Sequence, residues 1–243
     1  MNQHALDFTM IGILFVLLPL FAMWKMRQLQ DSLQAGQPRA RLDSYRVTMI
    51  IQWGLVVVAL VLWRVTGREW SDLGLRLEGG MGAWIGSGLG LAVLVALAWQ
   101  TRSVLRSAEK RREVQAACAD LTDMLPQDVE ESRAFTALSV TAGICEELLY
   151  RGFVLAVLTP MLGAWWAVAA SSVAFGVAHA YQGPSGIAKT GAIGFAMAGL
   201  YLLTGSLWVP MIVHMAVDAN SGYLAFRCRG EPAVVAAGTA SCC

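Results

Sequence analysis

Charged residues are scarce in this chain of 243 residues, because Asp, Glu, Lys and Arg together make up only 14% of it. A soluble domain carries about 25%. Apolar residues make up 56%, and the mean hydropathy is +0.55. The scarcity of charge excludes an ordinary soluble domain and predicts a membrane protein with several spans. The net charge of +1 provides no excess of basic residues for binding nucleic acid, so we expect no nucleic-acid partner.

Cysteine and histidine are too few, and too widely spaced, for the usual structural metal sites. The five cysteines show neither C-x-x-C spacing nor a regular framework, which excludes a zinc ribbon and a disulfide scaffold. The three histidines form no H-E-x-x-H motif. Cys145 borders an acidic pair, but a nucleophilic cysteine needs an adjacent base, so we expect a buried packing residue there.

Seven apolar stretches predict an all-α fold, a polytopic membrane helix bundle of about seven transmembrane helices. No basic segment or cleavage site precedes the first stretch, which we therefore expect to be an uncleaved span. Basic residues follow it from Lys25 to Arg46, and the positive-inside rule places this loop in the cytoplasm. Seven spans in the cytoplasmic membrane then put the amino terminus outside and the carboxyl terminus inside. The seven helices are predicted at Phe8–Trp24, Val47–Trp63, Gly79–Thr101, Asp128 to about Leu158, Trp165–His179, Thr190–Leu203 and Leu207–Phe226.

Between the third and fourth spans the chain becomes polar. Apolar residues from Val114 to Leu125 recur at helical spacing and predict an amphipathic cytoplasmic helix that ends at Pro126. Asp128-x-x-Glu131 is typical of a capping box and predicts the start of the fourth helix.

Small residues shape the third span and the end of the chain. Gly82, Gly86 and Gly90 recur every four residues on one face of the third span, which predicts that another helix packs closely there. From Gly230 onward we expect a disordered or surface-associated tail. Its final Cys242-Cys243 does not fit the C-a-a-X prenylation pattern.

Two carboxylates and a guanidinium interrupt the apolar run from Ala134 to Ala180. They are Glu146, Glu147 and Arg151. Each charged side chain costs roughly 2.5–3.5 kcal/mol at the centre of a bilayer, so the three together require partners or a function. On a helix, Glu147 and Arg151 lie four residues apart and can pair, whereas Glu146 is rotated by about 100° from its neighbour. We therefore expect Glu146 to be unpaired.

Three further polar residues lie in the later apolar helices. His179 ends the fifth predicted span, while His214 and Asp218 lie four residues apart in the seventh. Singly, each histidine is better explained as a hydrogen-bonded core residue, and Glu147 with Arg151 as a structural pair. Together with Glu146 they form a polar set that a helix bundle can gather around one hydrated pocket.

Three short motifs at helical spacing occur in order in this part of the chain. They resemble those of the CAAX protease and bacteriocin-processing (CPBP, or Abi) family of intramembrane endopeptidases. The motifs are Glu146-Glu147-x-x-x-Arg151, Phe175-x-x-x-His179 and His214-x-x-x-Asp218. The resemblance extends from Trp70 to Leu224. It predicts an N-terminal pair of spans with its loop (residues 1–69), a protease core (70–225) and a C-terminal tail (226–243).

The resemblance implies hydrolysis of a peptide bond, with Glu146 activating a water molecule. His179 and His214 then stabilise the oxyanion or polarise the water. A zinc site built from Glu146, His179 and His214 is the alternative, although the resembling family favours a mechanism without metal or other cofactor. Well-known members have Asn where this chain has Asp218. An ionised carboxylate cannot donate to an oxyanion, so Asp218 is expected to orient or charge His214.

The expected substrate is a membrane-embedded or lipid-associated protein or peptide, reached within the lipid bilayer. Two other functions are open on the sequence alone. One is a membrane immunity, binding or scaffold protein of the same fold without enzymatic activity. The other is a proton-coupled transporter, because carboxylates and histidines within spans also form proton relays.

Overall fold

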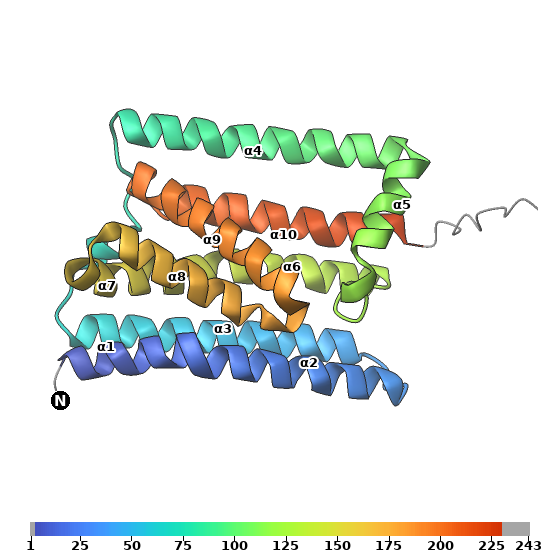
Figure 1. Ribbon diagram of the computed structural model, residues 1–243, viewed down its shortest axis with the longest axis horizontal. Helices are drawn as coiled ribbons and strands as arrows, with labels where there is room; N and C mark the ends of the chain where they lie inside the picture. The colour runs from blue at the N-terminus through green and yellow to red at the C-terminus, as the bar shows by residue number, and fades with distance from the viewer. Residues whose placement is uncertain (1–2, 230–243) are drawn as a thin grey trace, which may run out of the picture.

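The computed structural model describes residues 3–229, and these residues form helices joined by short connections, with no strand among them (Figure 1). The predicted tail, residues 230–243 with its terminal cysteines, lies outside the described residues. The predicted all-α fold is confirmed.

The first two long helices form a hairpin. α1 (Gln3–Gly12), the π-helical η1 (Ile13–Leu17) and α2 (Leu18–Gln34) run on as one continuous helix. The chain then turns through Arg39, whose left-handed φ of 68° reverses its direction, into α3 (Ala40–Val65).

The rest of the chain supplies the other helices of the bundle. A polar excursion separates α4 from α6. The amphipathic helix predicted up to Pro126 is wrong beyond Ala117, because α5 ends there and the chain continues through the 3-10 turn η3 and further turns. The elements are η2 (Trp70–Leu73), α4 (Met81–Arg106), α5 (Ala108–Ala117), η3 (Ala119–Leu121), α6 (Val129–Glu146), the π-helical η4 (Glu147–Val154), α7 (Leu155–Leu162), α8 (Ala164–Ala178), η5 (Ala180–Gln182), α9 (Gly183–Thr204) and α10 (Trp208–Cys228).

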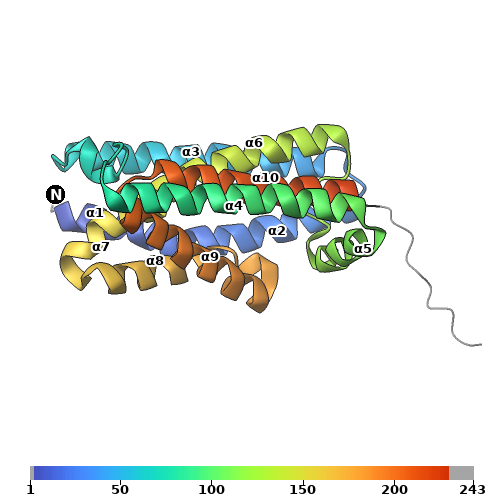
Figure 2. The same cartoon turned by 90° about the horizontal axis from the view of Figure 1, so that it is seen from above.

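α6 lies at the centre of the arrangement. It packs against α10 on one side and α3 on the other, while α4 lies beyond α10 and the α1–α2 helix beyond α3 (Figure 1). α8 and α9 pack on each other and form a layer along the bundle, which the view in Figure 2 separates from α3 and α6. The central position of α6 surrounds its carboxyl end with other helices.

The π-helical segment η4 is the most deeply buried part of the chain. Tyr150, Phe153 and Val154 are at most 1% exposed, and they pack with Trp63 of α3 in the main apolar core. Cys145, just before this segment, is fully buried among the same residues, as expected of a packing cysteine.

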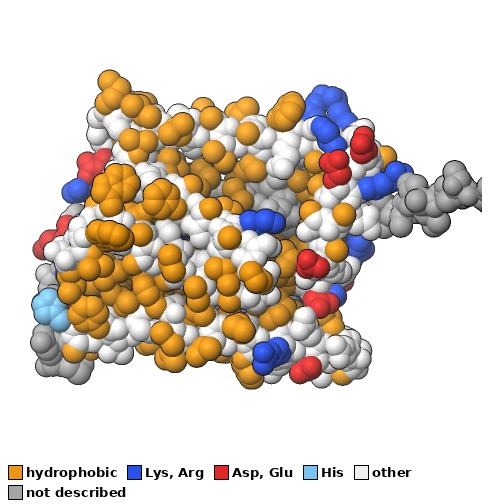
Figure 3. Space-filling view, viewed as in Figure 1, with side chains coloured by type: hydrophobic (Ala, Val, Ile, Leu, Met, Phe, Trp, Pro, Cys, Tyr) orange, Lys and Arg blue, Asp and Glu red, His pale blue; other side chains and the backbone are white. Residues whose placement is uncertain are grey.

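Within the described residues, four helices are long and apolar enough to cross a membrane. Large apolar side chains cover much of the surface, and acidic and basic groups gather mostly toward the two ends of the molecule (Figure 3). These features support a membrane helix bundle; the count of seven spans and the orientation of the termini stay predictions. The four helices are His4–Gln34, Ala40–Val65, Met81–Arg106 and Ala180–Thr204, and α8 is a shorter apolar helix.

Several local predictions can be compared with the helix boundaries. Asp128 Oδ1 accepts a hydrogen bond from the backbone N–H of Glu131 at 2.8 Å, which confirms the N-cap. The Glu131 carboxylate reaches back one residue further than in a capping box, to the N–H of Gln127 at 2.7 Å. The fourth predicted helix continues through Pro160 to Leu162, four residues beyond the predicted end.

The glycine face of α4 packs closely, as predicted. A Cβ atom added to Gly90 would lie 2.7 Å from Cγ1 of Val209 in α10, which is too close for any real side chain. A Cβ atom added to Gly82 would likewise lie too close to the backbone of Leu203 in α9. These two glycines therefore let α4 approach both later helices.

Candidate active site

The predicted pair of Glu147 and Arg151 is present at the beginning of η4. Arg151 Nη1 donates to Glu147 Oε1 at 3.0 Å, and Arg151 Nη2 donates to the carbonyl of Gly194 in α9 at 2.9 Å. The guanidinium also lies over the Phe175 ring, 4.5 Å from its centroid. Because both charged side chains are at most 1% exposed, each is stabilised by the other rather than by water.

Glu147 has a second partner that the sequence did not indicate. His214 Nδ1 lies 2.8 Å from Glu147 Oε1 and donates to it. A carboxylate in this position sets the orientation of an imidazole ring and fixes which nitrogen carries the proton. The expectation that Asp218 orients or charges His214 stays a prediction; Asp218 Oδ2 lies 3.5 Å from His214 Nε2, within ion-pair distance, on the other side of the ring.

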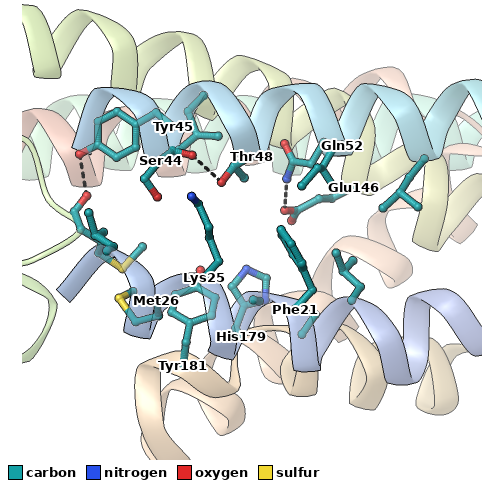
Figure 4. Close-up of a pocket in the computed structure, with 18 of the residues that line it drawn as sticks. Phe21, Lys25, Met26, Ser44, Tyr45, Thr48, Gln52, Glu146, His179 and Tyr181 are labelled. Carbon is teal, nitrogen blue, oxygen red and sulfur yellow. Dashed lines mark hydrogen bonds between the residues drawn. The ribbon is translucent and has the colours of Figure 1, made fainter. Parts of the chain in front are cut away.

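Glu146 is not unpaired, contrary to the expectation from helical spacing. Gln52 of α3 donates from Nε2 to Glu146 Oε1 at 2.8 Å (Figure 4). The other carboxylate oxygen, Oε2, lies 3.8 Å from His214 Nε2, a distance at which a protonated imidazole forms an ion pair. Oε2 is buried and has no hydrogen-bond partner among the described residues. The expectation was wrong because it considered one helix alone.

Gln52 is a partner of Glu146 in the candidate site that sequence reasoning missed. A signal was present, because Gln52 is an amide within the otherwise apolar second span. Buried amides require hydrogen-bond partners, so a lone one in a span indicates a contact between helices. The signal does not reveal which helix supplies the partner.

His179 follows the last residue of α8, and its ring is held by its own helix. Nδ1 lies 2.8 Å from the carbonyl oxygen of Phe175, which only accepts hydrogen bonds, so Nδ1 carries the proton. The second ring nitrogen, Nε2, is then available as an acceptor. The rings of Phe175 and His179 lie 4.8 Å apart, and Phe175 also contacts His214 at 6.0 Å. Phe175 thus supports both histidines.

A largely apolar cavity lies between α2, α3, η4 and the end of α8. Glu146 and His179 both line it, from different helices, and Gln52 lies beside Glu146 (Figure 4). Lys25 of α2 and Tyr181 of η5 line the same cavity. His214 is next to Glu146 but outside the cavity wall. Glu146 therefore lies between two groups: the cavity, whose wall includes His179, on one side, and His214 with Asp218 of α10 on the other.

Among residues 3–229, no group of three or more His, Cys, Asp or Glu side chains is arranged to hold a metal ion. The alternative zinc set of Glu146, His179 and His214 stays a prediction. Zinc ligands lie about 2.0–2.3 Å from the ion, which requires the three donors to converge on one point.

Residues 130–220 match a protein-family model described as Rce1-like, type II CAAX prenyl endopeptidase. This region is similar to the Rce1-like family. The match confirms the resemblance to the CAAX protease family over a narrower stretch than residues 70–225. No curated protein and no solved structure matches the chain. The Rce1-like region contains Glu146, Glu147, His179, His214 and Asp218, whereas Gln52 precedes it by many residues.

Proposed function

We infer that this chain is an intramembrane endopeptidase that hydrolyses a peptide bond of a membrane-embedded or lipid-associated protein. One observation carries this inference: Glu146 lies at the wall of an apolar cavity, shares that cavity with His179 and lies 3.8 Å from His214. A carboxylate at a cavity, with one imidazole in the cavity wall and a second beside the carboxylate, provides the groups that hydrolysis requires. The match to the Rce1-like family supports the same reaction class.

In the proposed mechanism, Glu146 acts as the general base. Its carboxylate removes one proton from a water molecule as the water oxygen bonds to the carbonyl carbon of the substrate. The proton is later transferred from Glu146 to the leaving amine nitrogen as the C–N bond breaks. Because His179 carries its proton on Nδ1, its Nε2 is available in the cavity as an acceptor for the peptide N–H of the substrate.

His214 is suited to a different role. Its Nδ1–H is held by Glu147, so Nε2 is the nitrogen that faces Glu146 and Asp218. When protonated, Nε2 donates to the oxyanion of the tetrahedral intermediate. A donor of this kind contributes roughly 3–4 kcal/mol to the transition state in other enzymes. The ionised Asp218 cannot donate itself but stabilises the imidazolium from 3.5 Å.

We favour the glutamate mechanism over zinc because Glu146, His179 and His214 come from three separate helices and lack the H-E-x-x-H spacing that places two ligands on one helical turn. Treatment of the purified chain with EDTA or phenanthroline, followed by metal analysis, tests this choice. Retained activity in metal-free protein is expected; loss that zinc restores would establish the metal route.

The proposed function is tested by comparing membrane polypeptides, using mass spectrometry, in cells with the wild-type chain and with Glu146→Gln. A polypeptide is expected to accumulate uncut in the variant. Glu130→Gln is the matched control, because Glu130 lies on the same helix but its side chain is 58% exposed. Unchanged polypeptides with a folded Glu146→Gln protein would exclude proteolysis. Altered proton flux in that case would support the transporter, and an intact phenotype the binding protein.

A further inference from the structure

The hydrogen bond between Gln52 and Glu146 joins two parts of the chain that are 94 residues apart. Gln52 lies on α3, outside residues 130–220, and its side chain is 9% exposed. Burying an amide in apolar surroundings costs about 1–3 kcal/mol unless it is hydrogen bonded. One half of this amide, the N–H, is satisfied by Glu146 Oε1 at 2.8 Å.

The second polar atom of each side chain has no hydrogen-bond partner in the described part of the protein. Gln52 Oε1 and Glu146 Oε2 are both buried, and neither has a hydrogen-bond partner among the described residues. Both atoms are acceptors only, so they cannot bond to each other. The two residues also line the same cavity. Each oxygen therefore lacks a donor, and one water molecule has two hydrogens, enough to serve an acceptor on each of two residues that are hydrogen bonded to each other.

We propose that Gln52 is a further catalytic residue, whose Oε1 accepts one hydrogen of the attacking water while Glu146 Oε2 accepts the other. This inference rests on the proposed function. With both hydrogens engaged, a lone pair of the water oxygen is left for the substrate carbonyl. The hydrogen held by Glu146 is transferred as the bond to carbon forms and the carbonyl electrons move to oxygen. The hydrogen held by Gln52 stays on the attacking oxygen, and Gln52 itself exchanges no proton.

Gln52 also affects the base directly. Its N–H donates to Glu146 Oε1, so it fixes the carboxylate plane and leaves Oε2 as the oxygen that receives the proton. The N-terminal hairpin then supplies part of the catalytic machinery, rather than only a wall for the Rce1-like region.

A direct test needs no substrate. An experimental map of the full chain that resolves ordered water is expected to show one within hydrogen-bond distance of both Gln52 Oε1 and Glu146 Oε2. The same site in a Gln52→Met protein is expected to lack it, because the thioether is at best a weak acceptor. A well-resolved wild-type site in which the two oxygens bind separate waters, or none, would overturn the proposal.

A kinetic test uses the polypeptide that accumulates with Glu146→Gln, labelled at one end and reconstituted with the enzyme in vesicles. Gln52→Met is expected to lower kcat about 100-fold, the order of effect of one positioned hydrogen-bonding group, with KM changed less than about twofold. Thr48→Val is the matched control, because Thr48 lies one turn earlier on α3 and lines the same cavity, but its hydroxyl donates to the Ser44 carbonyl. This variant should keep wild-type kcat.

Gln52→Glu provides a readout that a merely structural role would not give. The carboxylic acid that it introduces has both a donor and an acceptor when protonated, but repels Glu146 when ionised. Activity relative to Gln52→Met is therefore expected to rise as the pH falls. The groups facing Glu146 are the same in both variants: His179, His214, Asp218 and Arg151.

The outcomes separate this proposal from the proposed function. If Gln52→Met keeps kcat within about threefold of wild type while Glu146→Gln is inactive, Gln52 is not catalytic and the protease assignment stands. If Glu146→Gln cleaves normally, the proposed function itself is wrong. If Gln52→Met does not fold, the proposal is tested by the pH dependence of Gln52→Glu and by the water position in the wild-type map.

Discussion

The buried group formed by Glu147, Arg151 and His214 allows a quantitative prediction for Glu147→Gln. The substitution keeps the size of the side chain and an oxygen that accepts hydrogen bonds, but it removes the charge opposite Arg151. That guanidinium is 1% exposed, and its other polar partner is the neutral carbonyl of Gly194. Removing one partner of a buried ion pair costs about 3–5 kcal/mol, because the remaining charge is left uncompensated.

For a chain of this length, each 1 kcal/mol lowers the unfolding midpoint by about 2–4 °C, so a decrease of about 6–20 °C is expected. The assay is thermal unfolding of the purified chain in detergent, followed by tryptophan fluorescence at a fixed scan rate. Glu130→Gln is the control, because its pair with Arg39 at 3.3 Å is about 60% exposed and contributes about 0–1 kcal/mol. That variant should unfold close to the wild-type midpoint.

A double variant separates lost charge balance from lost packing. Combining Glu147→Gln with Arg151→Met removes both charges, so part of the lost stability is expected to return. A Glu147→Gln midpoint within about 2 °C of wild type would refute the reasoning, because it would show that Arg151 is solvated or neutralised by another group.

Two other predictions concern Asp218 and the contact between α6 and α10. Asp218→Asn is expected to retain most activity, because an amide at this position can donate to the oxyanion. Asp218→Ala is expected to lose much of the activity. Equal losses of kcat in the two variants would contradict a role for a polar side chain at position 218. Gly143→Ala places a Cβ about 2.8 Å from the backbone nitrogen of Met215 and is expected to cost about 1–3 kcal/mol in the same thermal assay. Gly88→Ala meets nothing within 4 Å and is its control, so equal midpoints for the two would show that α10 moves away without cost.

Several features could be predicted because they depend on residues close together in the chain. The pair of Glu147 and Arg151 follows from their spacing of four residues, and it survives in the π-helical η4. The N-cap at Asp128 and the small-residue face of α4 are equally local. The all-α membrane fold follows from the low charge and the apolar runs. The three motifs, whose residues are at helical spacing, all lie within residues 130–220, which match the Rce1-like model.

Tertiary structure alone decided which groups meet at the site. The sequence predicted an unpaired Glu146, but packing places Gln52 against Glu146. Packing also gives His214 a partner in Glu147 that the sequence did not indicate, beside Asp218 on its own helix. Helical spacing determines which residues share a face, whereas the rotation of each helix about its own axis depends on how its whole surface packs. Contacts across helices, such as the one between α3 and α6, are therefore set only when the bundle assembles, because burying apolar side chains fixes those rotations together.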